Sequence, residues 1–369
     1  MDNLVAVAGH FALQGRVIDV RPFGNGNIND TFLATMDARG TSEEEKHFVL
    51  QRINTLVFRR PDLVMRNMRI ATEHIRNRLR HAADSKGRRW EVPVVLSAQN
   101  GRDHWLDADG SFWRAISFIE GVKSFDTIRD VDHAGKVGYA LGMFHLLLSD
   151  LPPERLADTL EGFHITPRYL QHYDEVLAKY RATESPDLDY CLRFVSGRRA
   201  LTHVLEKARA EDRLLLRPIH GDPKVNNILM DNATMRAVSI VDLDTVKPDL
   251  VHYDIGDCLR SGCNPMGEET GDWKAVHFAT DLCRAILKGY LSKAREFLTE
   301  NDFDYIFDSV RLIAFELGLR FFTDHLEGDV YFKVKHAGHN LARALVQFRL
   351  TESIEAQETV IRNIIRGIK

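Results

Sequence analysis

The sequence has little of what marks secreted, membrane-spanning or zinc-binding proteins. It contains four cysteines, at positions 191, 258, 263 and 283, and no two of them form a CxxC pair. Cysteines this sparse are typical of reduced thiols in a cytoplasmic protein rather than of a disulfide framework. No uncharged apolar run approaches the length of a membrane span, and the first residues do not follow the pattern of a signal peptide. We therefore expect a cytoplasmic protein without a membrane partner.

A strong excess of charge of either sign is also missing. The 49 Lys and Arg residues nearly balance the 53 Asp and Glu residues, and the basic residues are scattered along the chain. This distribution argues against a nucleic-acid partner. The 369 residues are enough for two lobes that each bury a core of their own. Neither composition nor length indicates the oligomeric state.

Residues 217–247 form the most informative stretch of the chain. Its first polar residues follow the pattern His220-x-Asp222-x4-Asn227. Two short apolar runs separated by a polar turn come next, and Asp242 follows the second run. Two strands joined by a tight turn form a hairpin, which would bring Asp222, Asn227 and Asp242 together at one of its ends.

These side chains suit phosphoryl transfer from ATP to a hydroxyl group. The attacking hydroxyl needs an oxygen that accepts its proton, and Asp222 is the candidate general base. Mg²⁺ prefers oxygen ligands, which the amide of Asn227 and the carboxylate of Asp242 can supply. Protein kinases have the same spacing in H-R-D-x-x-x-x-N, followed by a metal-binding aspartate. Asp244 is expected to help position the metal or the substrate, whereas His220 is expected to brace the loop.

A glycine-rich turn near the N-terminus is the candidate phosphate-binding loop. Gly24 and Gly26 lie between two expected strands, at residues 16–23 and 31–36. Because glycine has no Cβ, the backbone of such a turn can approach phosphate groups closely. The turn is a weak signal alone, but it agrees with the catalytic pattern downstream.

The third expected strand, residues 47–53, carries an unusual residue for a kinase. Gln51 lies where protein kinases have a lysine that binds the α- and β-phosphates. The neighbouring Arg52 must point to the opposite face of the strand from Gln51. Because the usual cation is missing, a nucleotide-binding pseudokinase with a regulatory or scaffold role stays open as an alternative.

The rest of the pattern predicts a bilobal α+β fold like that of a protein kinase. Phe118 and Ile119 would form the hinge, where backbone groups can bind adenine. Residues 1–120 are the expected nucleotide-binding lobe, with a small antiparallel sheet, and residues 121–369 the larger helical lobe, with the catalytic and substrate-binding residues. Further strands are expected at residues 92–98 and 112–119, and helices at 4–14, 61–81, 131–148, 168–180, 187–210, 272–292, 301–325 and 338–367.

The sequence resembles the aminoglycoside phosphotransferase-like kinases, and within them the bacterial N-acetylhexosamine 1-kinases. The resemblance covers nearly the whole chain. It rests on the catalytic stretch and on GHFAL at 9–13, GNGNIN at 24–29, YDIGD at 253–257 and LEGDVYF at 326–332. It implies an enzyme that uses ATP and Mg²⁺ to phosphorylate the anomeric (C1) hydroxyl of N-acetylglucosamine or N-acetylgalactosamine. Its partner would be a small sugar, and its role would lie in amino sugar metabolism.

The resemblance also implies which residues bind the two ligands. The implied ATP contacts are Gly24, Gly26, Gln51, Phe118 and Ile119. The implied sugar contacts are Asn27, Asn29, Asp222, Asp244, Arg320, Asp324 and Tyr331. Members of the subfamily carry a histidine at the position of Asn27, and the residues around Arg320 could instead form an ion-pair network at a helix end. A kinase of the same fold that acts on an amino alcohol or an aminoglycoside stays open, and the sequence does not choose between the gluco and galacto epimers.

Overall fold

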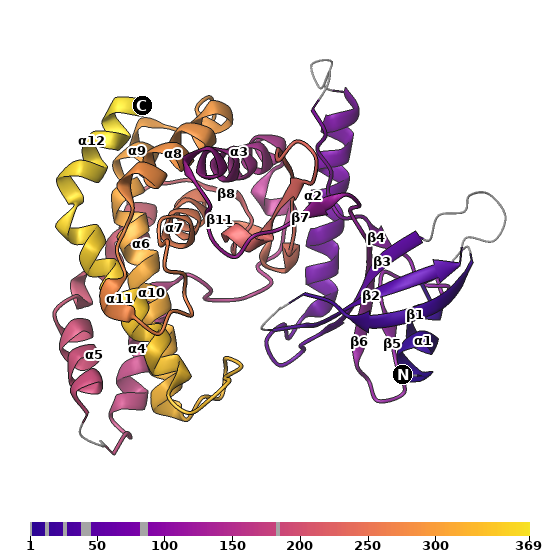
Figure 1. Ribbon diagram of the computed structural model, residues 1–369, viewed down its shortest axis with the longest axis horizontal. Coiled ribbons are helices and arrows are strands. Elements are labelled where there is room, and N and C mark those ends of the chain that lie inside the picture. Colours follow the sequence, from indigo (N-terminus) through magenta and orange to yellow (C-terminus); the bar gives the residue numbers. More distant parts are fainter. Residues whose placement is uncertain (1, 12–14, 25–27, 38–45, 82–87, 182–184) are drawn as a thin grey trace.

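The computed structural model describes residues 2–11, 15–24, 28–37, 46–81, 88–181 and 185–369. It has the predicted bilobal α+β fold, with a small sheet lobe (the N-lobe) and a larger helical lobe (the C-lobe) (Figure 1). The N-terminus lies beside the sheet, and the C-terminus lies on the far side of the C-lobe. No helix in the described ranges combines the length and the apolar character that crossing a membrane requires.

The N-lobe is built around one antiparallel sheet with the strand order β1-β2-β3-β6-β4, in which β5 also pairs with β6. Its strands are β1 Arg16–Pro22, β2 Asp30–Asp37, β3 Lys46–Ile53, β4 Val95–Leu96, β5 Trp105–Leu106 and β6 Phe112–Ser117. Helix α1 (Asp2–Gly9) packs on one face, where the core includes Phe48 and Leu50. Helix α2 (Pro61–His81) packs on the other face, against Ile53 and Phe112. Strand alternation therefore sends the odd-numbered residues of β3 toward α2.

The N-lobe departs from the prediction in the length of two elements. The strand expected at 92–98 is only Val95–Leu96, because Pro93 has no N–H for a sheet hydrogen bond. The helix expected at 4–14 ends at Gly9 in the described part of the chain. In contrast, α2 starts and ends where predicted, since Pro61 suits the first helical position.

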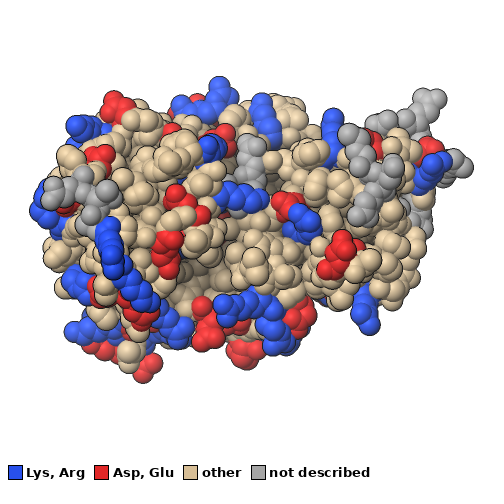
Figure 2. Space-filling model, turned by 90° about the horizontal axis from the view of Figure 1, so that it is seen from below, with Lys and Arg blue, Asp and Glu red and all other residues tan. Residues whose placement is uncertain are grey.

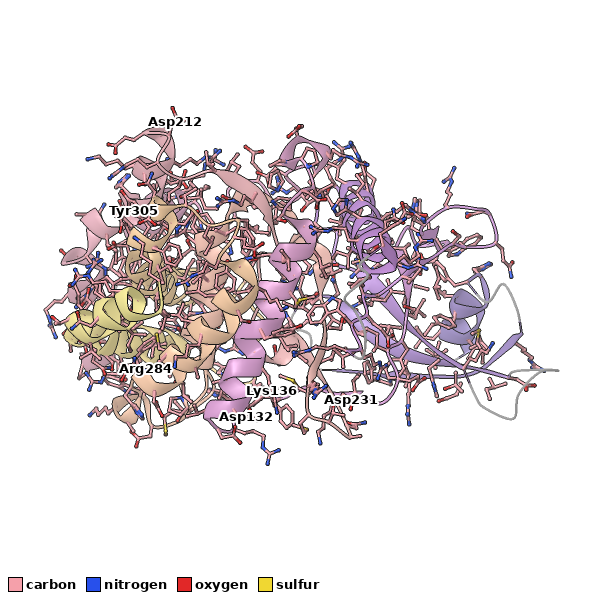
Figure 3. All side chains as sticks on the ribbon, turned by 90° about the horizontal axis from the view of Figure 1, so that it is seen from above. Asp132, Lys136, Asp212, Asp231, Arg284 and Tyr305 are labelled. Carbon is pink, nitrogen blue, oxygen red and sulfur yellow. The ribbon has the colours of Figure 1, made fainter. Side chains whose placement is uncertain are left out.

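The chain enters the C-lobe directly after the sheet. Residues 118–121 follow β6, and β7 (Val122–Lys123) then pairs with β9 (Ile228–Asp231). The far end of the β9 hairpin is tied to this crossing, because Asn232 donates its N–H to the carbonyl of Gly121 at 2.9 Å. Asp231 accordingly lies near the boundary between the lobes (Figure 3).

The C-lobe is a set of helices packed around two short hairpins. The strand pairs are β9 with β10 (Ala237–Ile240) and β8 (Leu216–Ile219) with β11 (Lys247–Leu250). The helices are α3 Val131–Leu148, α4 Thr166–Leu177, α5 Pro186–Ser196, α6 Val204–Ala210, α7 Val251–Gly262, α8 Thr280–Ala294, α9 Glu300–Asp304, α10 Ile306–Glu327, α11 His339–Ala356 and α12 Glu358–Ile368. Three long predicted helices are therefore divided, at residues 197–203, at Tyr305 and at Gln357.

Helices α3 and α8 pack unusually closely. A Cβ at Gly138 would lie 1.9 Å from the carbonyl oxygen of Ile286, and one at Gly289 would lie 2.0 Å from that of Gly135. Only glycine fits at these crossings, so the pair forms a rigid support for the hairpins. On the outer side of α3, Asp132 and Lys136 form an ion pair one turn apart (Figure 3). Basic and acidic side chains are interspersed on the face shown in Figure 2, as expected from the balanced composition.

Candidate active site

The β9–β10 hairpin brings the three catalytic candidates together. The N–H of Val241 donates to the carbonyl of Asn227 at 2.8 Å, so Asn227 and Asp242 lie at the same end of the hairpin. The amide nitrogen of Asn227 donates to the carbonyl of Asp222 at 2.7 Å. This arrangement is the one that the sequence predicted. It leaves the amide oxygen of Asn227 available as a ligand.

The buried carboxylate of Asp254 fixes the loop that carries Asp222. This carboxylate accepts the backbone N–H groups of His220 at 2.6 Å and of Gly221 at 2.7 Å, and it also contacts His145 at 2.8 Å. His220 in turn contacts the carbonyl of Val241 at 2.9 Å, and its burial lowers the pKa of its imidazole. His220 therefore braces the loop, as predicted, and Asp254 anchors it.

A second support of this loop was not predicted from the sequence. The imidazole of His164 contacts the carbonyl of Gly221 at 2.8 Å and the carboxylate of Glu316 at 2.9 Å. Burial opposes ionisation of His164, but the charge of Glu316 and the contacts of the imidazole with Glu316 and Gly221 together outweigh it and raise the pKa of the imidazole. The backbone of His164 has a positive φ of 66°. A lone histidine in an irregular segment carries no pattern that could have revealed this contact.

Asp222 lies beside a cation that sequence reasoning also missed. The ammonium of Lys224 is 2.7 Å from the carboxylate of Asp222. Burial opposes ionisation of Lys224, but Asp222 and Asp242 outweigh it and raise the pKa of the ammonium. A fixed positive charge at this place favours anionic groups of a nucleotide. The position of Lys224, two residues after Asp222, was the sequence feature that could have predicted this contact.

Asp242 combines a rare backbone conformation with a negative surrounding. Its φ of 68° is in the left-handed region, which non-glycine residues seldom adopt and which is common at functional sites. The residue as a whole is exposed, but the protein groups packed around its carboxylate reduce the hydration of that group. This desolvation and the charges of Asp244 and Asp222 raise the pKa of Asp242 to about 7. Its carboxylate and the amide oxygen of Asn227 form a donor set that fits Mg²⁺.

On the N-lobe side, the position of the usual kinase lysine is filled by a pair of residues. Gln51 and Arg114 lie opposite each other on β3 and β6. The guanidinium of Arg114 donates to the side-chain oxygen of Gln51 at 2.7 and 2.9 Å and pairs with Asp244 at 2.5 Å. Arg52 lies on the other face, where it pairs with Asp30. The cation of this region therefore comes from β6.

The remaining predicted nucleotide contacts are described in part. Gly24 has a φ of +74°, which suits glycine, whereas Gly26 and Asn27 lie outside the described residues. The ring of Phe118 packs edge-on against Phe23 at the end of β1. Among the described residues, no backbone hydrogen bond outside helices and strands involves Phe118 or Ile119. The sequence prediction that these two residues bind adenine therefore stays a prediction.

A pocket between the lobes adjoins Asp222. It is lined from the C-lobe by Asp222, Arg320 and Tyr331, among others, and from the N-lobe by Ile28, Val57 and Phe58. Arg320 and Tyr331, which were predicted as sugar contacts, lie in its wall. The structure therefore places a candidate acceptor site next to the candidate base.

Arg320 is held in this pocket by aromatic rings. Its guanidinium carbon lies 5.1 to 5.9 Å from the ring centres of Phe163, Tyr169, Tyr331 and Phe332. We call this set the aromatic cage. In the described part of the chain, Arg320 forms no ion pair, so the alternative of a helix-end ion-pair network does not hold for it. Its N–H donors are available to a ligand.

Three of the predicted sugar contacts, Asp324, Asn29 and Asp244, have internal partners and do not line the pocket. Asp324 is buried and does not line the pocket; its carboxylate accepts the backbone N–H groups of Val330, Tyr331 and Phe332 at 2.7 to 2.9 Å. Asp324 thus orders the loop that carries Tyr331. Asn29 donates to Asp244 at 2.5 Å and accepts the N–H of Asn54.

The fold and the site together are those of a kinase-like phosphotransferase. Residues 19–292 match the model of the phosphotransferase enzyme family described as APH, and this match covers well over half of the chain. The chain therefore belongs to this family, whose members transfer phosphoryl groups to alcohols.

Several solved structures share the fold. The structure of a microcompartment-associated aminopropanol kinase has a TM-score of 0.61 and 16% identity, over 97% of this chain and 98% of that one. An aminoglycoside phosphotransferase from Alicyclobacillus acidocaldarius has a TM-score of 0.59 and 15% identity, over 98% and 96%. A choline kinase from Cryptosporidium parvum has a TM-score of 0.58 and 14% identity, over 94% and 91%. At such identities the likeness shows the fold alone.

Proposed function

We propose that this phosphotransferase uses ATP and Mg²⁺ to phosphorylate the C1 hydroxyl of an N-acetylhexosamine, N-acetylglucosamine or N-acetylgalactosamine. The observation that carries the proposal is Arg320 in its aromatic cage. A fixed cation there repels a positively charged amino alcohol. It offers several N–H donors to the hydroxyl and acetamido oxygens of a neutral sugar, while Tyr331 offers an aromatic surface.

The residues at the end of the catalytic hairpin would carry out the phosphoryl transfer. The C1 hydroxyl oxygen attacks the γ-phosphorus, the bond to the bridging oxygen of ADP breaks, and Asp222 accepts the proton. Lys224 lies where its charge can stabilise the transferred group. Asn227 and Asp242 would hold Mg²⁺, which neutralises phosphate charge when bound. Catalysis then comes from alignment and electrostatic stabilisation.

The nucleotide site belongs to the proposal as well. We assign residues 1–120 to the nucleotide-binding lobe, with adenine at the backbone of Phe118 and Ile119 and phosphates near Gly24, Gly26 and Gln51. A spectinomycin phosphotransferase of the same fold was solved with ADP, which supports this use of the cleft. Residues 121–369 would bind the acceptor, directly through Arg320 and Tyr331 and indirectly through Asp324 and Asp244. Asn29, from the N-lobe, would act indirectly through Asp244, and Asn27 stays a proposed contact. The four cysteines are free and buried, which suits the proposed cytoplasmic location.

One observation favours a second candidate, a kinase of an amino alcohol or aminoglycoside. Besides Asp222, the pocket is lined by Asp257, Glu268, Glu269 and Glu316, and carboxylates suit a cationic acceptor. Each of these four, however, already contacts Arg260, Arg343 or His164. A pseudokinase is disfavoured because the base and both metal ligands are present.

Phosphorus NMR tests the proposal. The purified protein, with ATP and Mg²⁺, is offered N-acetylglucosamine, N-acetylgalactosamine, glucose, choline, ethanolamine and an aminoglycoside, beside the Asp222→Asn variant. We expect an anomeric sugar phosphate from an N-acetylhexosamine, and none from the variant. Turnover of a cationic acceptor alone would retain the kinase and refute the sugar. Equal turnover by the variant would refute the role of Asp222.

A further inference from the structure

Arg114 is a buried cation for which the family pattern on β3 gave no indication. It lies on β6, opposite Gln51 of β3, and 1% of it is exposed. Both residues point to the face of the sheet that α2 covers, since Arg114 also contacts the sulfur of Met68. A buried guanidinium requires partners for its charge and its N–H groups. Here those partners come from both lobes.

The partner in the C-lobe is Asp244, two residues beyond the proposed metal ligand Asp242. Asp244 is 3% exposed, and each of its oxygens contacts a residue of the N-lobe. One oxygen lies 2.5 Å from the guanidinium of Arg114, and the other accepts from the side chain of Asn29 at 2.5 Å. Asn29 follows the glycine-rich turn and also accepts the backbone N–H of Asn54. One carboxylate thus joins the C-lobe metal loop to two places in the sheet lobe.

We propose that the Arg114–Asp244 ion pair positions the metal loop against the N-lobe, and that Arg114 thereby supplies from β6 the cation that Gln51 does not supply from β3. Arg114 is a positioning residue in this scheme. It acts on nucleotide and metal through Asp244, because the segment 242–244 is too short to let Asp242 move independently of Asp244. The inference rests on the proposed ATP site and is independent of which acceptor is used.

The geometry distinguishes this pair from a partly buried ion pair of the C-lobe. It crosses between the lobes, whereas the contact of Arg198 with Glu355 at 2.7 Å lies within the C-lobe. It also lies beside a backbone with positive φ at Asp242, which needs support from its surroundings. A pair that only added stability would have no reason to involve the metal loop.

Nucleotide binding tests the proposal without an acceptor. Arg114→Met keeps the unbranched apolar stem of the side chain and removes the charge. Arg114→Met/Asp244→Asn removes both charges, so that no buried charge is left alone if the single variant folds poorly. Arg198→Met, which breaks a partly buried ion pair within the C-lobe, is the control. For each protein we would measure the Kd of a non-hydrolysable ATP analogue by calorimetry at several Mg²⁺ concentrations, and the thermal unfolding temperature.

We expect both Arg114 variants to bind the analogue about ten- to a hundredfold more weakly, and to need more Mg²⁺, because the metal loop is displaced. The double variant should be no weaker than the single one, since both break the same link. Arg114→Lys should recover part of the affinity. Arg198→Met should change the unfolding temperature alone. An unchanged Kd and Mg²⁺ dependence in folded Arg114→Met or in the double variant would overturn the proposal. Failure of the sugar assignment would leave all these measurements unaffected.

Discussion

Two arginines flank the catalytic hairpin, and the protein holds them in opposite ways. Arg114, on the nucleotide side, is almost fully buried and pairs with the carboxylate of Asp244. Arg320, on the acceptor side, is half-buried and surrounded by aromatic rings. Carboxylate pairing neutralises a charge and fixes two elements to each other, whereas cation–π contacts leave the N–H groups of the guanidinium free. The first arginine suits positioning, and the second suits ligand binding.

The different surroundings of the two arginines match the different needs of the two proposed ligands, the nucleotide and the sugar. A nucleotide is highly charged and binds with a metal, so its site needs a fixed geometry for Asn227 and Asp242. A neutral sugar offers only hydroxyl and amide groups, so its site needs accessible donors. A variant of either arginine should therefore affect the binding of one ligand, whereas a variant of Asp222 should affect the transfer between them.

The largest effect is expected for Asp222→Asn, where the two regions meet. Asparagine keeps the shape but cannot accept the proton, so kcat should fall by about 10²- to 10⁴-fold, the usual contribution of a general base. Steady-state kinetics with the best acceptor would measure this loss, and calorimetry should find nucleotide affinity nearly unchanged. A variant that keeps most of its kcat would show that another group takes the proton.

Asp242→Ala should have the next largest effect, confined to the nucleotide side. Removal of this carboxylate leaves one protein ligand for Mg²⁺, so nucleotide and metal affinity should fall together by about tenfold or more. Calorimetric titration of ATP with and without Mg²⁺ would measure this, and the difference between the two titrations should largely disappear. A loss of the same size without Mg²⁺ would contradict the metal role.

On the acceptor side, Arg320→Met should weaken the binding of the sugar and leave the binding of ATP almost unchanged. Loss of charge-assisted hydrogen bonds, each worth about 1.5–3 kcal/mol, should raise KM for the sugar by about ten- to a hundredfold, with KM for ATP within about twofold. Kinetics with each substrate varied in turn would measure both constants. An equal rise in both would remove the distinction between the two arginines.

Arg320→Ala, which removes most of the side chain, tests whether Arg320 excludes cationic ligands from the pocket. Without the guanidinium, the aromatic cage becomes open to a cationic head group, so choline binding should appear or strengthen. Calorimetry with choline on the wild-type protein and on the variant would measure the gain. If the wild-type protein already binds choline more tightly than the sugar, the proposal that Arg320 repels cationic acceptors is wrong.

The sequence was most informative where the site is local in the chain. Asp222, Asn227 and Asp242 come from one hairpin, and the bounds of α2 and α3 follow from Pro61 and from the N-cap Asp130. Arg114 could not be predicted, because its role depends on the sheet register that places it opposite Gln51, 63 residues earlier in the chain. These contacts are long-range, and no periodicity records them.

Asp324 illustrates a different limit. The sequence does not show whether a carboxylate near a proposed sugar contact faces the ligand or the protein interior. The structure turns it inward, onto three successive backbone N–H groups of the loop that carries Tyr331. The broken helices have a similar cause, since their apolar spacing continues across Tyr305 and Gln357 while the backbone turns.

The smallest effect on turnover is expected for His164→Gln, which weakens the support of the Asp222 loop on the acceptor side. Loss of one buried contact should destabilise the protein by about 1–3 kcal/mol. The folded protein raises the pKa of His164 above the unfolded value of 6.5, so the extra stability is complete below that value and is lost as pH rises through the folded pKa. Denaturant unfolding should therefore show a larger difference between wild type and variant at pH 6 than at pH 9. His172→Gln is the control, because its pair with Glu327 is exposed and contributes little at either pH. A difference for His164→Gln that is independent of pH would show that the imidazole supports Gly221 without its charge.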